Sequence, residues 1–243
     1  MMSSIKLQDK TVLITGACQG VGLRVAEILA KAGMSIIGVD CQEEKLVEAM
    51  ERLSVEYKVE SLARAADVRK ESAVKDAVAA AVERFGQIDV LVNNAGIRKV
   101  APVWETSTAL WDEILAVNLR GQFLVTREVL NQTMLNQDRG KIVLISSIAG
   151  LRGSKNSAAY CASKWGIRGL AHALAQDLKG REINVTVITP GRTDTPMARN
   201  SEQWNPDIGW LDTDAIGQAI LFFIQQDYSV EVPEIHLHHR AEL

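Results

Sequence analysis

The sequence predicts an α/β fold with one doubly wound parallel sheet of about seven strands and helices on both faces. Two observations predict it. Short apolar runs alternate along the chain with longer segments of helical period. The 243 residues contain no internal repeat, low-complexity tract or linker, so we expect a single domain over residues 1–243.

The elements of the first half follow one another in a regular order. Residues 11–15 (TVLIT) form a compact β-branched run, which is typical of a buried parallel strand. A glycine-rich turn leads to a helix over 21–31, where apolar residues recur at helical spacing and Gly33 is a stop signal. The remaining elements expected here are a strand at 35–39, a helix at 42–53, a weak strand at 61–65, a helix within 67–85 ended by Gly86, and a strand at 88–92.

The second half continues the same alternation. We expect a long helix over 110–135, a strand at 141–145, a helix at 157–178, a strand at 183–188, a helix at 214–226 and a last strand at 235–237. Strands that alternate with helices imply right-handed βαβ units. Residues 189–212, rich in Pro, Trp and Asn, are the one long stretch without a regular pattern. We expect them to form a substrate lid, because such loops in compact domains are usually functional.

Composition narrows the functional class. The hydrophobic fraction is 47%, the charged fraction 23% and the net charge −3, values of a soluble globular protein without a nucleic-acid footprint. No apolar run is long enough for a transmembrane helix. The scattered Cys18, Cys41 and Cys161 form no CxxC pair, which argues against disulfides and a metal site. We therefore expect a cytoplasmic protein without a metal, a nucleic-acid partner or a membrane partner.

The segment 15–22 (TGACQGVG) joins the first predicted strand to the first predicted helix. Gly16, Gly20 and Gly22 permit positive φ angles and close backbone approach, and a helix N-terminus favours a pyrophosphate. Gln19 and Val21 lie between these glycines. The G-x-x-x-G-x-G spacing departs from the generic G-x-G-x-x-G fingerprint, so a tight strand-to-helix turn is the alternative.

Asp40 ends the second predicted strand and strengthens the nucleotide interpretation. A carboxylate at this place accepts hydrogen bonds from the ribose hydroxyls of an adenosine and repels the 2′-phosphate of NADP. Cys41 follows it and Gln19 stands in the glycine loop, where an NADP site would be expected to carry Arg or Lys. We therefore favour NAD. The alternative for Asp40, which is compatible with the first, is an N-cap of the helix at 42–53.

Tyr160 and Lys164 stand four residues apart, on one face of the helix predicted at 157–178. An ammonium group near a phenol favours the phenolate, so the pair is suited to taking a proton from an alcohol. Ser147 follows the strand at 141–145, at the carboxyl edge where ligands bind in such sheets. An ordinary exposed Tyr–Lys pair is the alternative.

Taken together, these residues resemble the short-chain dehydrogenase/reductase family from about residue 11 to residue 197. The motifs keep the family's order: TGxxxGxG at 15–22, Asp67-Val68, NNAG at 93–96, Asn118, Ser147, YxxxK at 160–164 and PGxxxT at 190–195. The resemblance implies a Rossmann-type fold and hydride transfer between a secondary alcohol carbon and C4 of a nicotinamide.

The resemblance also implies individual roles. Tyr160 is the expected general acid/base, Lys164 lowers its pKa and binds the nicotinamide ribose, and Ser147 hydrogen-bonds the substrate oxygen. Asn118 is expected to hold a water that links Lys164 to solvent, near a helix irregularity that Gly121 makes plausible. The expected cofactor-binding residues are Gly16, Gln19, Gly20, Val21, Gly22, Asp40, Asp67, Val68, Asn93, Ala95, Gly96, Tyr160, Lys164, Pro190, Thr193 and Thr195.

Cations gather in the segments expected to contact the substrate, although the chain is acidic. They are Arg98, Lys99, Arg152, Lys155, Arg192 and Arg199. We interpret them as a site for an anionic hydroxy compound, held chiefly by Arg98 and Arg152 together with Ser147 and Tyr160. Solvated surface charge is the alternative.

The last segment departs from the family pattern. Many members carry an Asp-Gly-Gly element after the last strand, whereas residues 232–240 here read VPEIHLHHR. Family members are often tetramers, so the resemblance implies a homotetramer or homodimer. His236, His238 and His239 stand without a carboxylate or Cys pattern that would indicate a metal.

Three functions compete. We favour an NAD-dependent secondary-alcohol dehydrogenase working in the direction of oxidation. The second is an NADPH-dependent ketoreductase of the 3-oxoacyl-(acyl-carrier-protein) reductase type. A comparison of the KM for NAD with the KM for NADP separates it from the first. The third is a non-enzymatic nucleotide-sensing protein, which predicts an eroded catalytic set, yet Asn118, Ser147, Tyr160 and Lys164 are all present.

Overall fold

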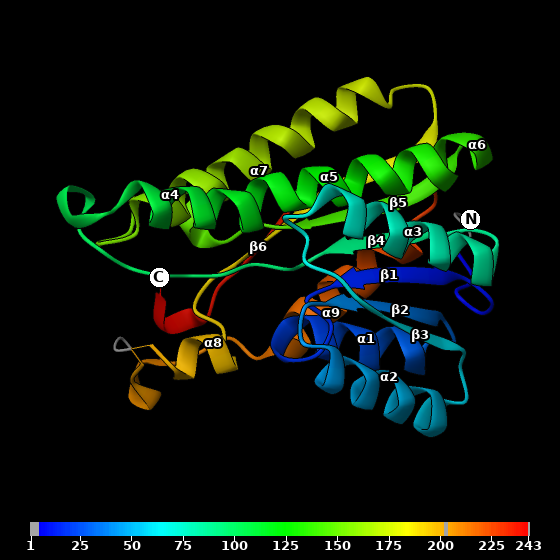
Figure 1. The fold of residues 1–243 in the computed structure, drawn as a ribbon, viewed down its shortest axis with the longest axis horizontal. Helices are drawn as coiled ribbons and strands as arrows, with labels where there is room; N and C mark the ends of the chain where they lie inside the picture. Colours follow the sequence, from blue (N-terminus) through cyan, green and yellow to red (C-terminus); the bar gives the residue numbers. More distant parts are fainter. Residues whose placement is uncertain (1–4, 202–203, 243) are drawn as a thin grey trace.

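The computed structural model describes residues 5–201 and 204–242 and confirms the predicted fold class (Figure 1). A seven-stranded parallel sheet has the order β3-β2-β1-β4-β5-β6-β7. The strands are β1 Thr11–Thr15, β2 Ser35–Asp40, β3 Ser61–Ala65, β4 Val90–Asn93, β5 Arg139–Ile145, β6 Glu182–Pro190 and β7 Glu234–Leu237. The strand order reverses between β1 and β4, and such a switch point opens a crevice at the carboxyl ends of the strands.

Helices cover both faces of the sheet (Figure 1). In the described part of the chain, the α-helices of four or more residues are α1 Gly20–Lys31, α2 Glu43–Tyr57, α3 Glu71–Phe85, α4 Thr108–Leu115, α5 Gly121–Val129, α7 Ala158–Asp177, α8 Pro196–Arg199 and α9 Thr213–Gln225. Side chains alternate between the two faces of the sheet along β1. Val12 and Ile14 pack in the core with α1, α2 and α9, whereas Leu13 packs in the core with α3, α5 and α7.

Two predicted segments differ in detail from the structure. The helix expected over 110–135 spans 108–137, because π-helical turns at Ala116–Arg120 and Leu130–Met134 join α4, α5 and the short α6 (Leu135–Gln137). The first π turn contains Asn118, where an irregularity was expected. Residues 189–212 are less irregular than expected: β6 runs to Pro190, and α8 and a 3₁₀ turn at Pro206–Ile208 follow.

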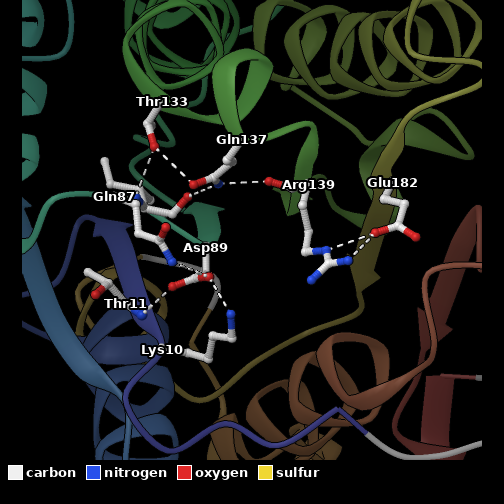
Figure 2. A network of polar contacts seen from close by, with 9 residues as sticks. Lys10, Thr11, Gln87, Asp89, Thr133, Gln137, Arg139 and Glu182 are labelled. Carbon is white, nitrogen blue, oxygen red and sulfur yellow. Dashed lines mark hydrogen bonds and ion pairs between the residues drawn. The ribbon is translucent and has the colours of Figure 1, made fainter.

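Polar side chains tie the amino ends of the central strands together (Figure 2). Asp89 accepts hydrogen bonds from Lys10 Nζ at 2.8 Å, from the Thr11 backbone N–H at 2.9 Å and from Gln87 Nε2 at 3.0 Å. Gln137 Nε2 donates to the carbonyl oxygen of Arg139 at 2.7 Å. These hydrogen bonds satisfy polar groups at the edge of the sheet opposite the crevice. They hold the amino ends of β1, β4 and β5 in position.

Lys141, the third residue of β5, is 1% exposed and is the unusual feature of this edge. Its Nζ donates to Asn184 Oδ1 at 2.7 Å and lies 4.6 Å from the ring centroid of Tyr228 and 5.2 Å from that of Phe223. Burial lowers the pKa of Lys141 to about 8, although Asp227 opposes the shift. The aromatic rings and one amide oxygen only partly replace the lost hydration.

The low pKa makes stability depend on pH at this residue. Between pH 8 and 10.5 the folded protein holds Lys141 neutral while the unfolded chain still binds the proton, so stability rises with pH in this window. Relative to Lys141→Met, the wild type should gain about 3 kcal/mol of unfolding free energy from pH 7 to pH 10.5. Urea unfolding of both proteins across this range measures the difference, and a constant difference would contradict the prediction.

Candidate active site

A cavity of about 1110 Å³ lies at the carboxyl edge of the sheet. The residues expected to bind cofactor that line it are Gly16, Gln19, Gly20, Val21, Asp40, Asp67, Val68, Ala95, Gly96, Tyr160, Lys164, Pro190, Thr193 and Thr195. Ser147, Arg98 and Arg152 line it too. The sequence thus brings together residues from segments that lie far apart along the chain.

The glycine loop forms a backbone cradle at the start of α1. Gly16 and Gly20 have φ angles of +68° and +58°, which favour glycine. At position 22 a glycine is required because there is no room for a side chain. A Cβ there would lie 2.0 Å from the carbonyl oxygen of Gly16. The first turn of α1 carries no acidic side chain. A helix N-terminus of this kind suits a pyrophosphate.

Asp40 is 9% exposed and lies where β2 ends at the cavity. Its Oδ2 accepts a hydrogen bond from the Cys18 N–H at 3.4 Å, and its Oδ1 accepts one from the Gln42 N–H at 3.1 Å. The alternative role as N-cap is wrong in detail, because α2 begins at Glu43 and Gln42 is its N-cap residue. The carboxylate instead joins the glycine loop to the turn that precedes α2.

Asp67 and Val68 follow β3 and form the neighbouring wall. The guanidinium of Arg69 holds Asp67 Oδ2 at 2.7 Å, and this contact lowers the pKa of that carboxyl below its usual value. Val68 packs against the backbone of Gly121, where a Cβ would meet its side chain at 2.8 Å. Arg69 was missed by sequence reasoning, although it stands two residues after Asp67.

Asn93 lies beside the cavity rather than in its wall, and its expected support of the adenosine half stays a prediction. Its side chain is 1% exposed, does not line the cavity and donates to Thr126 Oγ1 at 2.8 Å, on α5. Asn94 lines the cavity in its place, and its Nδ2 donates to the carbonyl oxygens of Thr15 at 3.0 Å and Gly16 at 3.2 Å. Asn94 therefore fixes the glycine loop against the end of β4. Successive side chains of a strand point to opposite faces of the sheet, so neighbouring residues such as Asn93 and Asn94 are expected to point in different directions.

Tyr160 and Lys164 lie one turn apart in α7, as expected. Lys164 Nζ lies 5.6 Å from the centroid of the Tyr160 ring and donates to the carbonyl oxygen of Ile145 at 2.9 Å. The Ser147 side chain hydrogen-bonds to Tyr160, and its Oγ also accepts from the Ala149 N–H at 3.3 Å. A phenol, a hydroxyl and an ammonium therefore meet at one place in the cavity.

Burial shifts the pKa values of both ionisable groups. Burial raises the pKa of Tyr160, while the hydrogen bond from Ser147 and the positive charge of Arg98 act to lower it. Burial lowers the pKa of Lys164 to about 8. The expected influence of Lys164 on the pKa of Tyr160 stays a prediction. The influence of Arg98, which sequence reasoning assigned only to substrate binding, places its charge near the phenol.

Asn118 is fully buried and does not line the cavity. Its Oδ1 accepts from the Ile97 N–H at 2.8 Å, and its Nδ2 donates to the Ile97 carbonyl at 3.0 Å and to Ser163 Oγ at 3.1 Å. Ser163 in turn donates to the carbonyl oxygen of Tyr160 at 2.7 Å. The side chain therefore holds the loop after β4 against α7, and its role in a proton relay stays a prediction.

The segment after β6 forms the opposite wall. Thr195 accepts from the Ala198 N–H at 3.2 Å and caps α8, whereas Thr193 Oγ1 donates to the Gly191 carbonyl at 3.1 Å. Trp210 lines the cavity, and its ring centroid lies 4.3 Å from that of Trp204. Met197, Arg192 and Glu242 also line it. Glu242 was not anticipated from the sequence.

The model of the family described as short chain dehydrogenase matches residues 10–206. The chain belongs to the short-chain dehydrogenase family. A trans-4-hydroxycyclohexanecarboxylate dehydrogenase of Sinomonas cyclohexanicum is 35% identical over 93% of this chain and 90% of its own. A 3-oxoacyl-(acyl-carrier-protein) reductase of Thermotoga maritima is 36% identical over 79% of this chain and 78% of its own.

Solved structures of the short-chain dehydrogenase family agree with this fold. The actinorhodin polyketide ketoreductase with NADPH is 31% identical and has a TM-score of 0.88, over 96% of this chain and 97% of that one. The chain is therefore a short-chain dehydrogenase/reductase whose fold binds a nicotinamide cofactor. No helix in the described part of the chain has the length and apolar character that crossing a membrane requires.

Proposed function

We propose that this short-chain dehydrogenase is an NAD-dependent dehydrogenase that oxidises a secondary alcohol bearing an anionic group. The observation that carries the choice of NAD is Asp40, whose carboxylate lines the cavity at the end of β2. Two backbone N–H groups hold this carboxylate in place, so it is a fixed negative charge at the position expected to meet the adenosine ribose. A 2′-phosphate beside it meets like charge.

The residues present fit the cofactor. The cradle at Gly22 leaves no room for a side chain, Asp40 offers ribose acceptors, and the cavity of about 1110 Å³ accommodates a dinucleotide with a small substrate. Bound there, the nicotinamide supplies hydride acceptance at its C4. Residues 190–195 at the carboxyl end of β6 are positioned to orient its amide.

The protein's own residues move the proton and place the substrate. Tyr160 Oη accepts the proton of the substrate hydroxyl, and Ser147 Oγ donates a hydrogen bond to the same oxygen. The ammonium of Lys164, 5.6 Å from the ring centroid, favours the phenolate form of Tyr160. Asn118 keeps the loop at Ile97 and the backbone of α7 in register, which sets the position of Tyr160.

Arg98 and Arg152 support an anionic substrate. Both line the cavity, and the charge of Arg98 acts on Tyr160. A guanidinium binds a carboxylate through paired N–H donors. The relative that acts on trans-4-hydroxycyclohexanecarboxylate, a hydroxy acid, adds support from outside the chain. We therefore propose a hydroxy carboxylate as the substrate class.

Charge removal at these arginines tests the substrate class. Arg98→Ala and Arg152→Ala should each lower kcat/KM for a hydroxy acid by about 10- to 100-fold, since a charged hydrogen bond is worth about 1.5–3 kcal/mol. A neutral alcohol should lose far less. A coupled screen of hydroxy acids, polyols and hydroxysulfonates with NAD finds the substrate first. Unchanged kcat/KM for the acid in both variants would remove the anionic substrate.

An NADPH-dependent ketoreductase is the second candidate. Two observations favour it: the named activity of the Thermotoga maritima relative and the NADPH held by the actinorhodin ketoreductase. Arg69 also lines the cavity, although it is paired with Asp67. Steady-state kcat/KM values with NAD and with NADP decide between the candidates, and a clear preference for NADPH would overturn our proposal.

A further inference from the structure

The segment after β7 folds back onto the cavity. Residues 238–242 end in a 3₁₀ turn at Arg240–Glu242, and Ala241 and Glu242 line the cavity. This is the segment whose sequence departs from the family's Asp-Gly-Gly element. The side chain of Glu242 therefore enters a site that the proposed function assigns to the coenzyme and the substrate.

The carboxylate of Glu242 lies on the backbone that follows β6. Its Oε1 accepts the backbone N–H of Arg192 at 2.8 Å and that of His239 at 3.4 Å. A Cβ built on Gly191 would lie 2.5 Å from both carboxylate oxygens, so the carboxylate packs directly against this glycine. The residue at 191 thus leaves the space that Glu242 fills.

Other contacts fix the segment in this position. The Glu242 N–H donates to the His239 carbonyl at 2.8 Å, and the Ala241 N–H donates to His239 Nδ1 at 3.2 Å. The His239 ring packs against Gly209, where a side chain would overlap it. The Arg192 carbonyl accepts from the Leu211 N–H at 2.7 Å, which holds the other side of the contact.

The negative charge of Glu242 affects which substrates can bind beside the Arg192 turn. Arg98, Arg152 and Arg192 line the same cavity. Arg192 Nη2 donates to the Ile208 carbonyl at 3.2 Å, and its Nε is buried with no hydrogen-bond partner among the residues that the structure describes. A substrate carboxylate that approached the Arg192 turn would find its backbone donor taken and a negative charge already there. Like charges in a cavity of low dielectric repel strongly.

We infer that Glu242 is a specificity-determining residue, whose carboxylate occupies the Arg192 backbone donor and weakens the binding of substrates that bring a second negative charge to that turn. The inference rests on the proposed dehydrogenase function and adds a selector to it. Anionic substrates are accepted where their charge reaches Arg98 and Arg152, and are penalised where it reaches Arg192.

The test compares a dicarboxylate with a monocarboxylate. Glu242→Gln keeps the size of the side chain and an acceptor for the Arg192 N–H, but removes the charge. We expect it to lower KM about 10-fold for a hydroxy dicarboxylate, whose second carboxylate reaches the Arg192 turn, and to leave KM for the monocarboxylate trans-4-hydroxycyclohexanecarboxylate unchanged. The matched control Glu231→Gln, an exposed residue outside the cavity, should change neither.

A binding measurement keeps the test independent of turnover. Cyclohexane-1,4-dicarboxylate and cyclohexanecarboxylate, which have no alcohol to oxidise, are titrated into each protein with NAD present, and tryptophan fluorescence is followed because Trp210 lines the cavity. In Glu242→Gln we expect about 10-fold tighter binding of the dicarboxylate and unchanged binding of the monocarboxylate. Equal affinity for the dicarboxylate in all variants, no binding to any of them, or an equal shift for the two acids would overturn the inference. Tighter binding of the dicarboxylate without turnover on any alcohol would instead overturn the proposed function.

Discussion

Replacing Tyr160 by Phe should lower kcat for alcohol oxidation by about 10²- to 10⁴-fold, the range expected when a general base is removed. The phenol hydroxyl is the only part lost, so the ring and Lys164 Nζ, 5.6 Å from its centroid, remain in place. We therefore expect coenzyme affinity to fall far less than kcat, because the loss is confined to one hydroxyl and a typical hydrogen bond is worth about 1 kcal/mol. Steady-state kinetics and coenzyme titration measure the two quantities separately.

The matched control is Tyr57→Phe, in α2 and outside the cavity, which should leave kcat unchanged. Equal loss in both variants would show that the proteins are damaged generally. A Tyr160→Phe protein that turns over as fast as the wild type would remove Tyr160 from the chemistry. A wild type that binds NAD without oxidising any alcohol would favour the nucleotide-sensing alternative.

The same residue sets the direction of the pH dependence. Burial raises the pKa of Tyr160 above its ordinary value, so without other charges the phenolate is scarce at neutral pH. Because the phenolate is the base, kcat/KM for oxidation should rise with pH, and kcat/KM for ketone reduction should fall. Burial lowers the pKa of Lys164 to about 8, so the ammonium that we expect to favour the phenolate is itself lost in alkaline solution.

The parts of the site that the sequence predicted are those that depend on one element or on the end of one strand. Tyr160 and Lys164 meet because four residues make about one helical turn, and Asp40 reaches the cavity because β2 ends there. A motif written as letters does not say which of two neighbouring asparagine side chains faces the cavity. The structure places Asn94 there, bonded to Thr15 and Gly16, and Asn93 against Thr126.

The parts that were missed depend on contacts between distant segments. Glu242 reaches Gly191 and Arg192 only because β7 pairs with β6, which brings residues about fifty positions apart to one edge. Nothing in the local pattern around residue 242 indicates such a contact. The short α8 within 189–212 was missed for a different reason, because its segment lacks hydrophobic periodicity. Thr195 caps this helix and Pro196 starts it.

Coenzyme preference should reverse when the charge at the end of β2 is reversed. The double variant Asp40→Ser with Cys41→Arg removes the carboxylate that repels a 2′-phosphate and adds a guanidinium that binds one. We expect the ratio of kcat/KM for NADP to that for NAD to rise by about 10²- to 10³-fold, since a like-charge contact costs several kcal/mol. Asp40→Asn, which keeps an acceptor oxygen, should show a smaller rise.

The hydrogen bonds of Asp40 determine what else changes. Its carboxylate holds the N–H groups of Cys18 and Gln42, so the double variant should also lose some affinity for both coenzymes alike. The ratio cancels that common loss and isolates the charge effect. Asp76→Asn is the matched control, because Asp76 is an exposed carboxylate of α3 outside the cavity, so its ratio should stay constant. A wild type that prefers NADP, with a ratio insensitive to Asp40, would show that the carboxylate does not face the 2′-position.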